Sequence, residues 1–149
     1  MTRRVSIFGA TGSVGQNTID LIARAPAAYD VVALTGSSNI SQLASDAIRL
    51  RADIAVTADE ARLDDLKQAL EGSGVAAAAG QAALTEAACR PTDWVMSAIV
   101  GAAGLAPGLC ALQQGATLAL ANKESLVCAG ALMLETAKAH DARLLPVDS

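Results

Sequence analysis

Aromatic residues are almost absent from this 149-residue sequence, which contains one Trp, one Tyr and one Phe. Because 52% of its residues are apolar, its core must be built from Ala, Val, Leu and Ile, which suits thin helices packed closely on a sheet. A chain of this length buries roughly 68–70% of its unfolded surface when it folds as one domain. The composition therefore favours a single α/β domain.

Cysteine and clustered positive charge are also scarce. Cys89, Cys110 and Cys128 are odd in number and far apart in the sequence, and His140 is the one histidine. This pattern supports neither a disulfide framework nor a zinc site, so we expect three buried or inert thiols in a reducing compartment. A net charge of −4 with scattered Lys and Arg argues against non-specific binding to DNA or to anionic membranes.

Long hydrophobic runs are few. The apolar run at residues 5–8 is too short for the core of a signal peptide, so we expect a cytoplasmic protein. The stretch 94–122 carries no charge and is long enough for a membrane span. Several glycines and Pro107 interrupt it, which favours a strand, a loop, a helix and a further strand instead.

Short β-branched runs alternate along the chain with longer alanine-rich segments whose apolar residues recur at helical spacing. Strands separated by helices connect most simply as right-handed βαβ units. The pattern predicts an α/β fold with a doubly wound, mostly parallel sheet and helices on both faces. The predicted strands are residues 4–8, 30–34, 53–56, 93–97, 117–120 and 143–147, with a weak one at 75–79, and the predicted helices are residues 13–25, 41–50, 61–71, 82–88, 106–113 and 125–140.

A glycine-rich turn follows the first predicted strand, with the spacing G-x-x-G-x-x-G at Gly9, Gly12 and Gly15. The first glycine permits a tight turn, the second lets the backbone approach a pyrophosphate, and the third lets helix and strand pack closely. Amides at the start of the next helix would face the phosphates. The pattern is typical of a Rossmann-type dinucleotide-binding domain, although the same glycines also occur in purely structural turns. The predicted contacts are Gly9, Thr11, Gly12, Ser13, Val14 and Gly15.

Thr11 and Ser13 would add hydroxyl donors to the phosphate oxygens, and the alternative role of both is capping of the helix that follows the turn.

The loop after the second predicted strand contains no acidic residue. NAD-binding domains usually hold the ribose hydroxyls with Asp or Glu at this place, and a carboxylate there would repel a 2′-phosphate. Ser37, Ser38 and Asn39 can instead donate hydrogen bonds to that phosphate, so the loop favours NADPH over NADH. No Arg stands in the loop to neutralise the phosphate, and the same residues can alternatively form a polar turn that caps the next helix.

Three later segments complete a family pattern. Residues 98–104 read Ala-Ile-Val-Gly-Ala-Ala-Gly, residues 121–127 read Ala-Asn-Lys-Glu-Ser-Leu-Val, and residues 146–149 read Pro-Val-Asp-Ser. In order and spacing, these segments and the glycine turn resemble the 1-deoxy-D-xylulose 5-phosphate reductoisomerase family over essentially the whole chain.

That resemblance implies a function. Residues 1–149 would form the NADPH-binding domain of an enzyme that converts 1-deoxy-D-xylulose 5-phosphate to 2-C-methyl-D-erythritol 4-phosphate, an isoprenoid precursor of the non-mevalonate pathway. The enzyme would need Mg²⁺ or Mn²⁺ and form a homodimer at full length. We expect the family's catalytic and C-terminal domains to be absent from this chain, and the chain alone to be inactive.

The resemblance also implies roles for individual residues. A divalent cation would polarise the substrate carbonyl, and Lys123 would stabilise oxyanion charge that develops near the nicotinamide. From the residues alone, the alternative is a helix N-cap at Asn122 with Lys123 and Glu124 solvated in the first turn, which is the commonest use of these residues. The implied cofactor contacts are Ala98, Ile99, Asn122 and Glu124. The implied substrate contacts are Lys123 and Ser149, and Lys123 is also the implied catalytic residue. The implied metal ligand is Asp148.

Two other functions share some of these features. A semialdehyde dehydrogenase has a similar glycine turn, but it needs a nucleophilic cysteine, and Cys128 lies inside a predicted helix. An NADP(H)-sensing regulatory module needs the glycines and no catalytic residues. A module of that kind does not account for residues 122–124 or 147–149.

Overall fold

The computed structural model of the chain describes residues 2–99, 101–121 and 123–147, and at residues 101, 102, 123–125 and 128 it describes the backbone. The strands are β1 (Arg3–Phe8), β2 (Tyr29–Gly36), β3 (Ile54–Thr57), β4 (Ala76–Ala79), β5 (Trp94–Ser97), β6 (Thr117–Leu120) and β7 (Arg143–Pro146). The helices are α1 (Ser13–Arg24), α2 (Ile40–Leu50), α3 (Leu63–Ala69), α4 (Gln81–Ala88), α5 (Leu105–Gln113) and α6 (Lys123–Ala139). Short 3-10 turns are η1 (Pro26–Ala28), η2 (Glu60–Arg62) and η3 (Gly101–Gly104).

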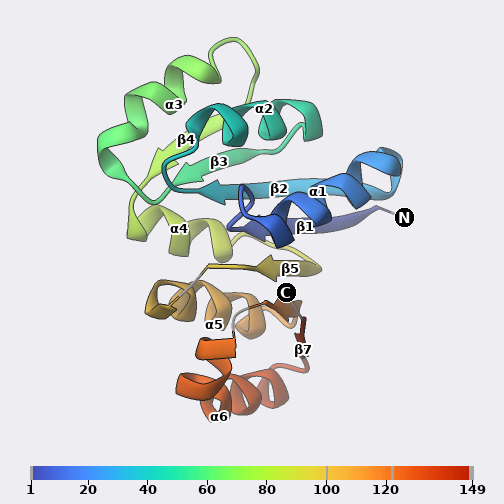
Figure 1. Ribbon diagram of the computed structural model, residues 1–149. Helices are drawn as coiled ribbons and strands as arrows, with labels where there is room; N and C mark the ends of the chain where they lie inside the picture. The colour runs from blue at the N-terminus through green and yellow to red at the C-terminus, as the bar shows by residue number, and fades with distance from the viewer. Residues whose placement is uncertain (1, 100, 122, 148–149) are drawn as a thin grey trace.

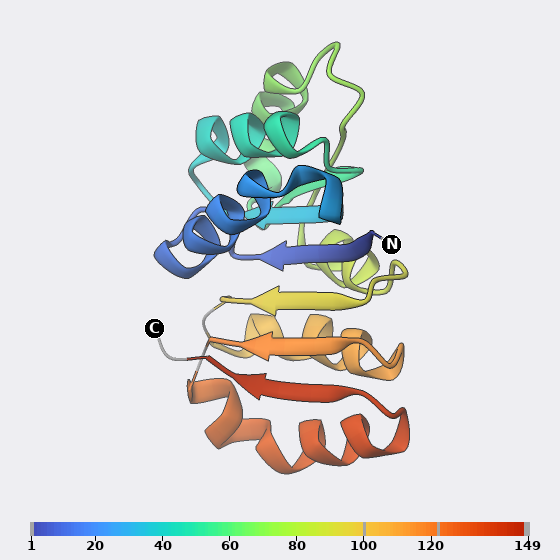
Figure 2. The ribbon, with the colours of Figure 1, turned by 90° about the vertical axis from the view of Figure 1, so that its right-hand side faces the viewer.

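The strands form one parallel sheet in the order β4-β3-β2-β1-β5-β6-β7, which runs from the top to the bottom of Figure 1. Figure 2 shows the strand arrows pointing the same way. The chain winds outward from β1 to β4 and then returns to β5 on the other side of β1. The strand order therefore reverses between β1 and β5, and such reversals are where open α/β sheets bind ligands. The predicted doubly wound parallel sheet is confirmed.

Helices cover both faces of the sheet and create two apolar cores. Because successive side chains of a strand point to opposite faces, Ile7 enters one core and Phe8 the other. Both side chains are fully buried. The first core receives α1, α2 and α3 through Ile19, Leu43 and Leu66, and the second receives α4, α5 and α6 through Leu84, Leu112 and Met133.

The weak strand predicted at 75–79 is present as β4, and the uncharged stretch 94–122 contains β5, η3, α5 and β6 as predicted. The helix predicted at 61–71 is instead the turn η2 followed by the shorter α3. The carboxylate of Asp59 accepts a hydrogen bond from Ala61 N at 3.1 Å, which starts the turn one residue earlier than predicted. Within the described residues, no helix has both the length and the apolar content needed to cross a membrane.

Candidate functional site

The glycine-rich turn is fixed to the end of β2. Gly9 N donates to Thr35 Oγ1 at 3.0 Å, and Ala10 N donates to Thr35 O at 2.7 Å. Gly9 has a φ of +84°, a left-handed conformation that favours glycine, and a Cβ there would lie 3.0 Å from the backbone of Ala98. The turn is therefore held between the carboxyl ends of β2 and β5.

The next two glycines differ in what surrounds them. A Cβ at Gly15 would collide with Gly9 O and would lie 2.6 Å from Ala10 Cα. A Cβ at Gly12 would meet nothing nearer than Gly9 O, at 3.8 Å. Gly15 therefore allows the close approach of α1 to the turn, as predicted, whereas Gly12 borders open space at the surface.

The first turn of α1 begins at this open space. Its first intrahelical hydrogen bond runs from Gln16 N to Gly12 O at 2.8 Å, so the amides of Ser13, Val14 and Gly15 precede the helical ladder. Gly12 occupies the N-cap position and no side chain caps the helix there, so the alternative capping role of Ser13 is wrong. Unpaired amides at a helix N-terminus attract anions.

The loop after β2 lies beside the turn, and Ser37, Ser38 and Asn39 are all exposed. Thr57 Oγ1 donates to Ser37 O at 2.7 Å, which fixes the start of the loop. Asn39 Oδ1 accepts from Gln42 N at 3.3 Å and caps α2. The alternative capping role is thus confirmed for Asn39, while the side-chain amide of Asn39 still offers donors at the surface.

Arg62 is a basic residue that the sequence reasoning missed, because that reasoning looked for Arg only within the loop itself. A hollow of about 550 Å³ lies between the loop and α3, and Arg62, Ser38 and Asn39 line it together with Asp65. Arg62 Nε pairs with Asp59 Oδ2 at 3.2 Å, and the Arg62 side chain is 43% exposed. The loops after neighbouring parallel strands meet at one edge of a sheet, and this rule could have pointed to Arg62.

A smaller hollow of about 230 Å³ joins the three loops of the predicted site. It lies at the carboxyl ends of β1, β2 and β5, and α4 borders it through Gln81. The structure therefore brings predicted contacts from separate segments to one place. Those that line the hollow are Gly9, Thr11, Ser37, Ala98 and Ile99.

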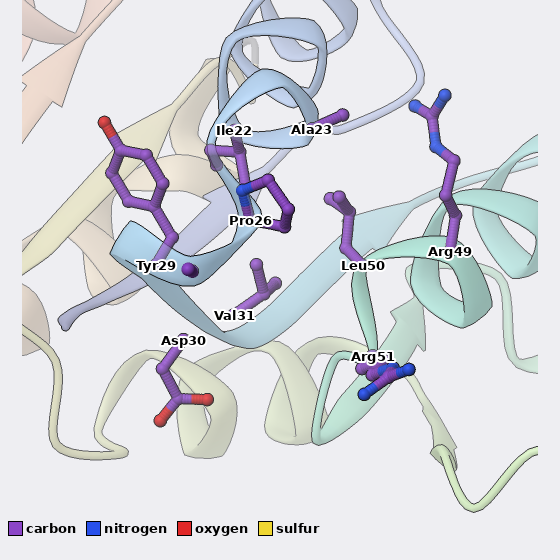
Figure 3. A pocket seen from close by; sticks show the side chains of 10 residues that line it. Ile22, Ala23, Pro26, Tyr29, Asp30, Val31, Arg49, Leu50 and Arg51 are labelled. Carbon is purple, nitrogen blue, oxygen red and sulfur yellow. The ribbon is translucent and has the colours of Figure 1, made fainter.

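A larger hollow, of about 780 Å³, lies at the opposite edge of the sheet. Figure 3 shows Ile22 of α1 and Pro26 of η1 on one side of this hollow and Leu50 of α2 on the other. Its floor is the amino end of β2 at Tyr29 and Val31. Parallel sheets bind ligands at the carboxyl ends of their strands, so the size of this hollow does not make it the candidate site.

The remaining predicted residues follow β6 and β7. Asn122, Asp148 and Ser149 lie outside the described residues. Lys123 and Glu124 begin α6 directly after β6 and so lie at the same carboxyl edge as the glycine turn. In the described part of the chain, no three His, Cys, Asp or Glu side chains gather in a way that could hold a metal ion.

Comparisons with known proteins agree with this geometry. The sequence profile of 1-deoxy-D-xylulose 5-phosphate reductoisomerase matches residues 5–130. Curated proteins of that name from Ruegeria pomeroyi and Jannaschia sp. are 79% and 76% identical to this chain over 147 residues. Each alignment covers 99% of this chain and 37% of the relative, so the chain spans well under half the length of these relatives.

Solved structures give the same assignment. The 1-deoxy-D-xylulose 5-phosphate reductoisomerase from Zymomonas mobilis in complex with NADPH has a TM-score of 0.97 and 52% identity, over 99% of this chain and 39% of that one. A DOX-P reductoisomerase in complex with NADPH, fosmidomycin and magnesium has a TM-score of 0.91 and 39% identity, over 99% of this chain and 36% of that one. The profile match over most of the chain, together with these identities, establishes that the chain belongs to the 1-deoxy-D-xylulose 5-phosphate reductoisomerase family.

Proposed function

We propose that this chain is the NADPH-binding domain of an enzyme that converts 1-deoxy-D-xylulose 5-phosphate to 2-C-methyl-D-erythritol 4-phosphate with the help of a divalent metal ion. One observation carries the proposal: a rigid glycine turn lies at the strand-order reversal of a parallel sheet, with the first turn of α1 open beside it. A relative with the same fold binds NADPH. Family membership argues against the semialdehyde dehydrogenase alternative.

The diphosphate of NADPH would lie against the start of α1. The amides of Ser13, Val14 and Gly15 precede the helical ladder and can donate to phosphate oxygens. Thr11 lines the adjacent hollow and can add a hydroxyl donor. Gly12 carries no side chain on the open surface, so the phosphates can approach the backbone closely.

The 2′-phosphate would lie at the loop after β2, where Ser37, Ser38 and Asn39 offer hydrogen-bond donors. Arg62 lines the hollow beside them and supplies the positive charge that the loop itself lacks. A guanidinium has five N–H donors, so the pairing of Arg62 Nε with Asp59 leaves donors for a phosphate. Charge-assisted hydrogen bonds of this kind are roughly twice as strong as neutral ones.

The nicotinamide end would lie toward β5 and β6. Ala98 and Ile99 border the smaller hollow, and we assign Asn122 and Glu124 to the same end of the cofactor because α6 begins at that edge of the sheet. The bound NADPH supplies the hydride for the reduction. Lys123 would bind the substrate and stabilise negative charge on its oxygen.

By the resemblance to the family, Asp148 would be a metal ligand and Ser149 a substrate contact. One carboxylate does not hold a catalytic divalent cation well, because such ions take several oxygen ligands. We therefore expect these 149 residues alone to show no turnover of substrate. We further propose a cytoplasmic location and a homodimer for the full-length enzyme.

A calorimetric titration of the chain with NADPH, and with NADH in parallel, tests the cofactor assignment. We expect saturable binding of NADPH and clearly weaker binding of NADH, because the nucleotides differ only in the 2′-phosphate. Equal affinities would contradict the role of the loop after β2. Absence of binding by either nucleotide would contradict the proposal that this chain forms the cofactor site by itself.

A further inference from the structure

Two cysteines that are distant in the sequence are in contact in the structure. Cys89 Sγ and Cys110 Sγ lie 2.6 Å apart, although the residues are separated by 21 positions. Cys89 is the C-cap residue directly after α4, and Cys110 lies within α5. Spacing in the sequence, where these cysteines are far apart, does not reveal this contact, because the contact depends on the packing of two helices.

The packing of α4 against α5 holds the two sulfurs together. The helices are neighbours in Figure 1, and Leu84 of α4 and Leu112 of α5 belong to the same apolar core. Beside the thiols, Gln114 Nε2 donates to Ala88 O at 2.7 Å, and Thr92 N donates to Gln114 Oε1 at 3.2 Å. These bonds tie the end of α5 to the end of α4, so the contact between the sulfurs belongs to a well-connected part of the fold.

The two thiols differ in their accessibility. Cys89 is exposed and Cys110 is half-buried, and neither is in a disulfide. Burial, followed by the hydrogen bond with Cys89 and repulsion from it, raises the pKa of Cys110 to about 11. Cys110 is therefore protonated at neutral pH, and Cys89 is the sulfur that an oxidant in solution meets first.

We propose that Cys89 and Cys110 form a reversible disulfide when the protein meets a low-molecular-weight disulfide such as oxidised glutathione. The thiolate of Cys89 attacks the small disulfide, which forms a mixed disulfide and releases one small thiol. Cys110 then loses its proton to solvent and attacks the Cys89 sulfur, which forms the protein disulfide and releases the second small thiol. Two protein thiols are oxidised and one small disulfide is reduced.

The proposed bond would connect α5 to α4, and α4 borders the candidate site through Gln81. Gln81, at the start of α4, donates from Nε2 to Ala103 O just before α5, at 3.4 Å. The disulfide would add a covalent link at the other end of α4. Because such a link restricts the unfolded chain more than the folded one, we expect the oxidised protein to melt at a higher temperature than the reduced protein.

The purified chain is incubated with oxidised glutathione, and its remaining thiols are then alkylated in the absence of denaturant. Linked peptides are identified by mass spectrometry after digestion. The chain has three cysteines. We expect a Cys89–Cys110 cross-link, one alkylatable thiol, and recovery of all three thiols after reduction. The variant C128S should keep the cross-link, whereas C89S and C110S should lose it.

Three results would overturn the proposal. One is a wild-type protein that keeps all three thiols alkylatable, and another is a stable glutathione adduct on Cys89 that does not resolve. The third is a cross-link that involves Cys128. Circular dichroism of each variant confirms that a missing cross-link does not come from unfolding, and the wild-type result alone decides the matter if a variant does not fold.

Discussion

Replacing Gly15 by Ala should disturb both the stability of the fold and the affinity for NADPH. The new Cβ would collide with Gly9 O and lie 2.6 Å from Ala10 Cα. These are backbone atoms of a turn that Thr35 holds in place, so no flexible side chain can move aside. Overpacking costs about 1–3 kcal/mol, and the collision with backbone places Gly15→Ala near the upper end. Subtracting about 1 kcal/mol for the better helix propensity of Ala leaves a net loss of about 2 kcal/mol.

Gly130→Ala is the control, because Gly130 lies in α6, directly after a kink at Ala129, and a Cβ there would have no neighbour within 4 Å. We expect this control to leave stability unchanged or to raise it by up to about 1 kcal/mol. Urea denaturation measures the free energy of unfolding of both variants. In a calorimetric titration, the shifted turn of Gly15→Ala should weaken NADPH binding at least about tenfold, equivalent to about 1.4 kcal/mol. Equal stability and equal affinity in the two variants would refute the packing argument.

Three further changes test other parts of the account. Arg62→Ala should weaken NADPH binding about tenfold, which corresponds to the loss of about one charge-assisted hydrogen bond. The same titration should show NADH binding unchanged. Arg49→Ala, at the opposite edge of the sheet, is the control variant. Ser38→Arg should strengthen NADPH binding relative to NADH, because it adds a cation to the proposed phosphate site, and an unchanged ratio would count against that site. Asp46→Ala should lower the free energy of unfolding, measured by urea denaturation, by about 1–3 kcal/mol, because the buried carboxylate accepts a hydrogen bond from Gln16 Nε2 at 2.8 Å. An unchanged free energy of unfolding would contradict the stabilising role of this hydrogen bond.

The fold could be predicted from the sequence because its signals are local. The strands are short, mostly apolar runs, α1 and α2 each have an apolar stripe, and parallel βαβ connections leave few ways to arrange the elements. The glycine turn was predictable for the same reason, since Gly9, Gly12 and Gly15 fall within seven consecutive residues of one strand–turn–helix unit. The order of the strands then brings the later loops to the same edge.

Features that depend on contacts between distant segments were not predictable in this way. Arg62 reaches the loop after β2 because β3 is the neighbour of β2 in the sheet. Cys89 and Cys110 meet because α4 and α5 pack side by side. The position of Ser13 inside the first turn of α1, and not at its N-cap, depends on how the glycine turn ends, which its residue type alone does not reveal.

The most direct test of the central claim is a nuclear magnetic resonance titration of the ¹⁵N-labelled chain with NADPH, followed at the backbone amides. The account predicts that the largest changes occur at residues 12–15 and 37–39, at the carboxyl edge of the sheet. Amides at residues 27–31 and 49–51, around the larger hollow at the opposite edge, should change little. Saturable changes centred on that opposite edge, with the glycine turn unaffected, would contradict the account.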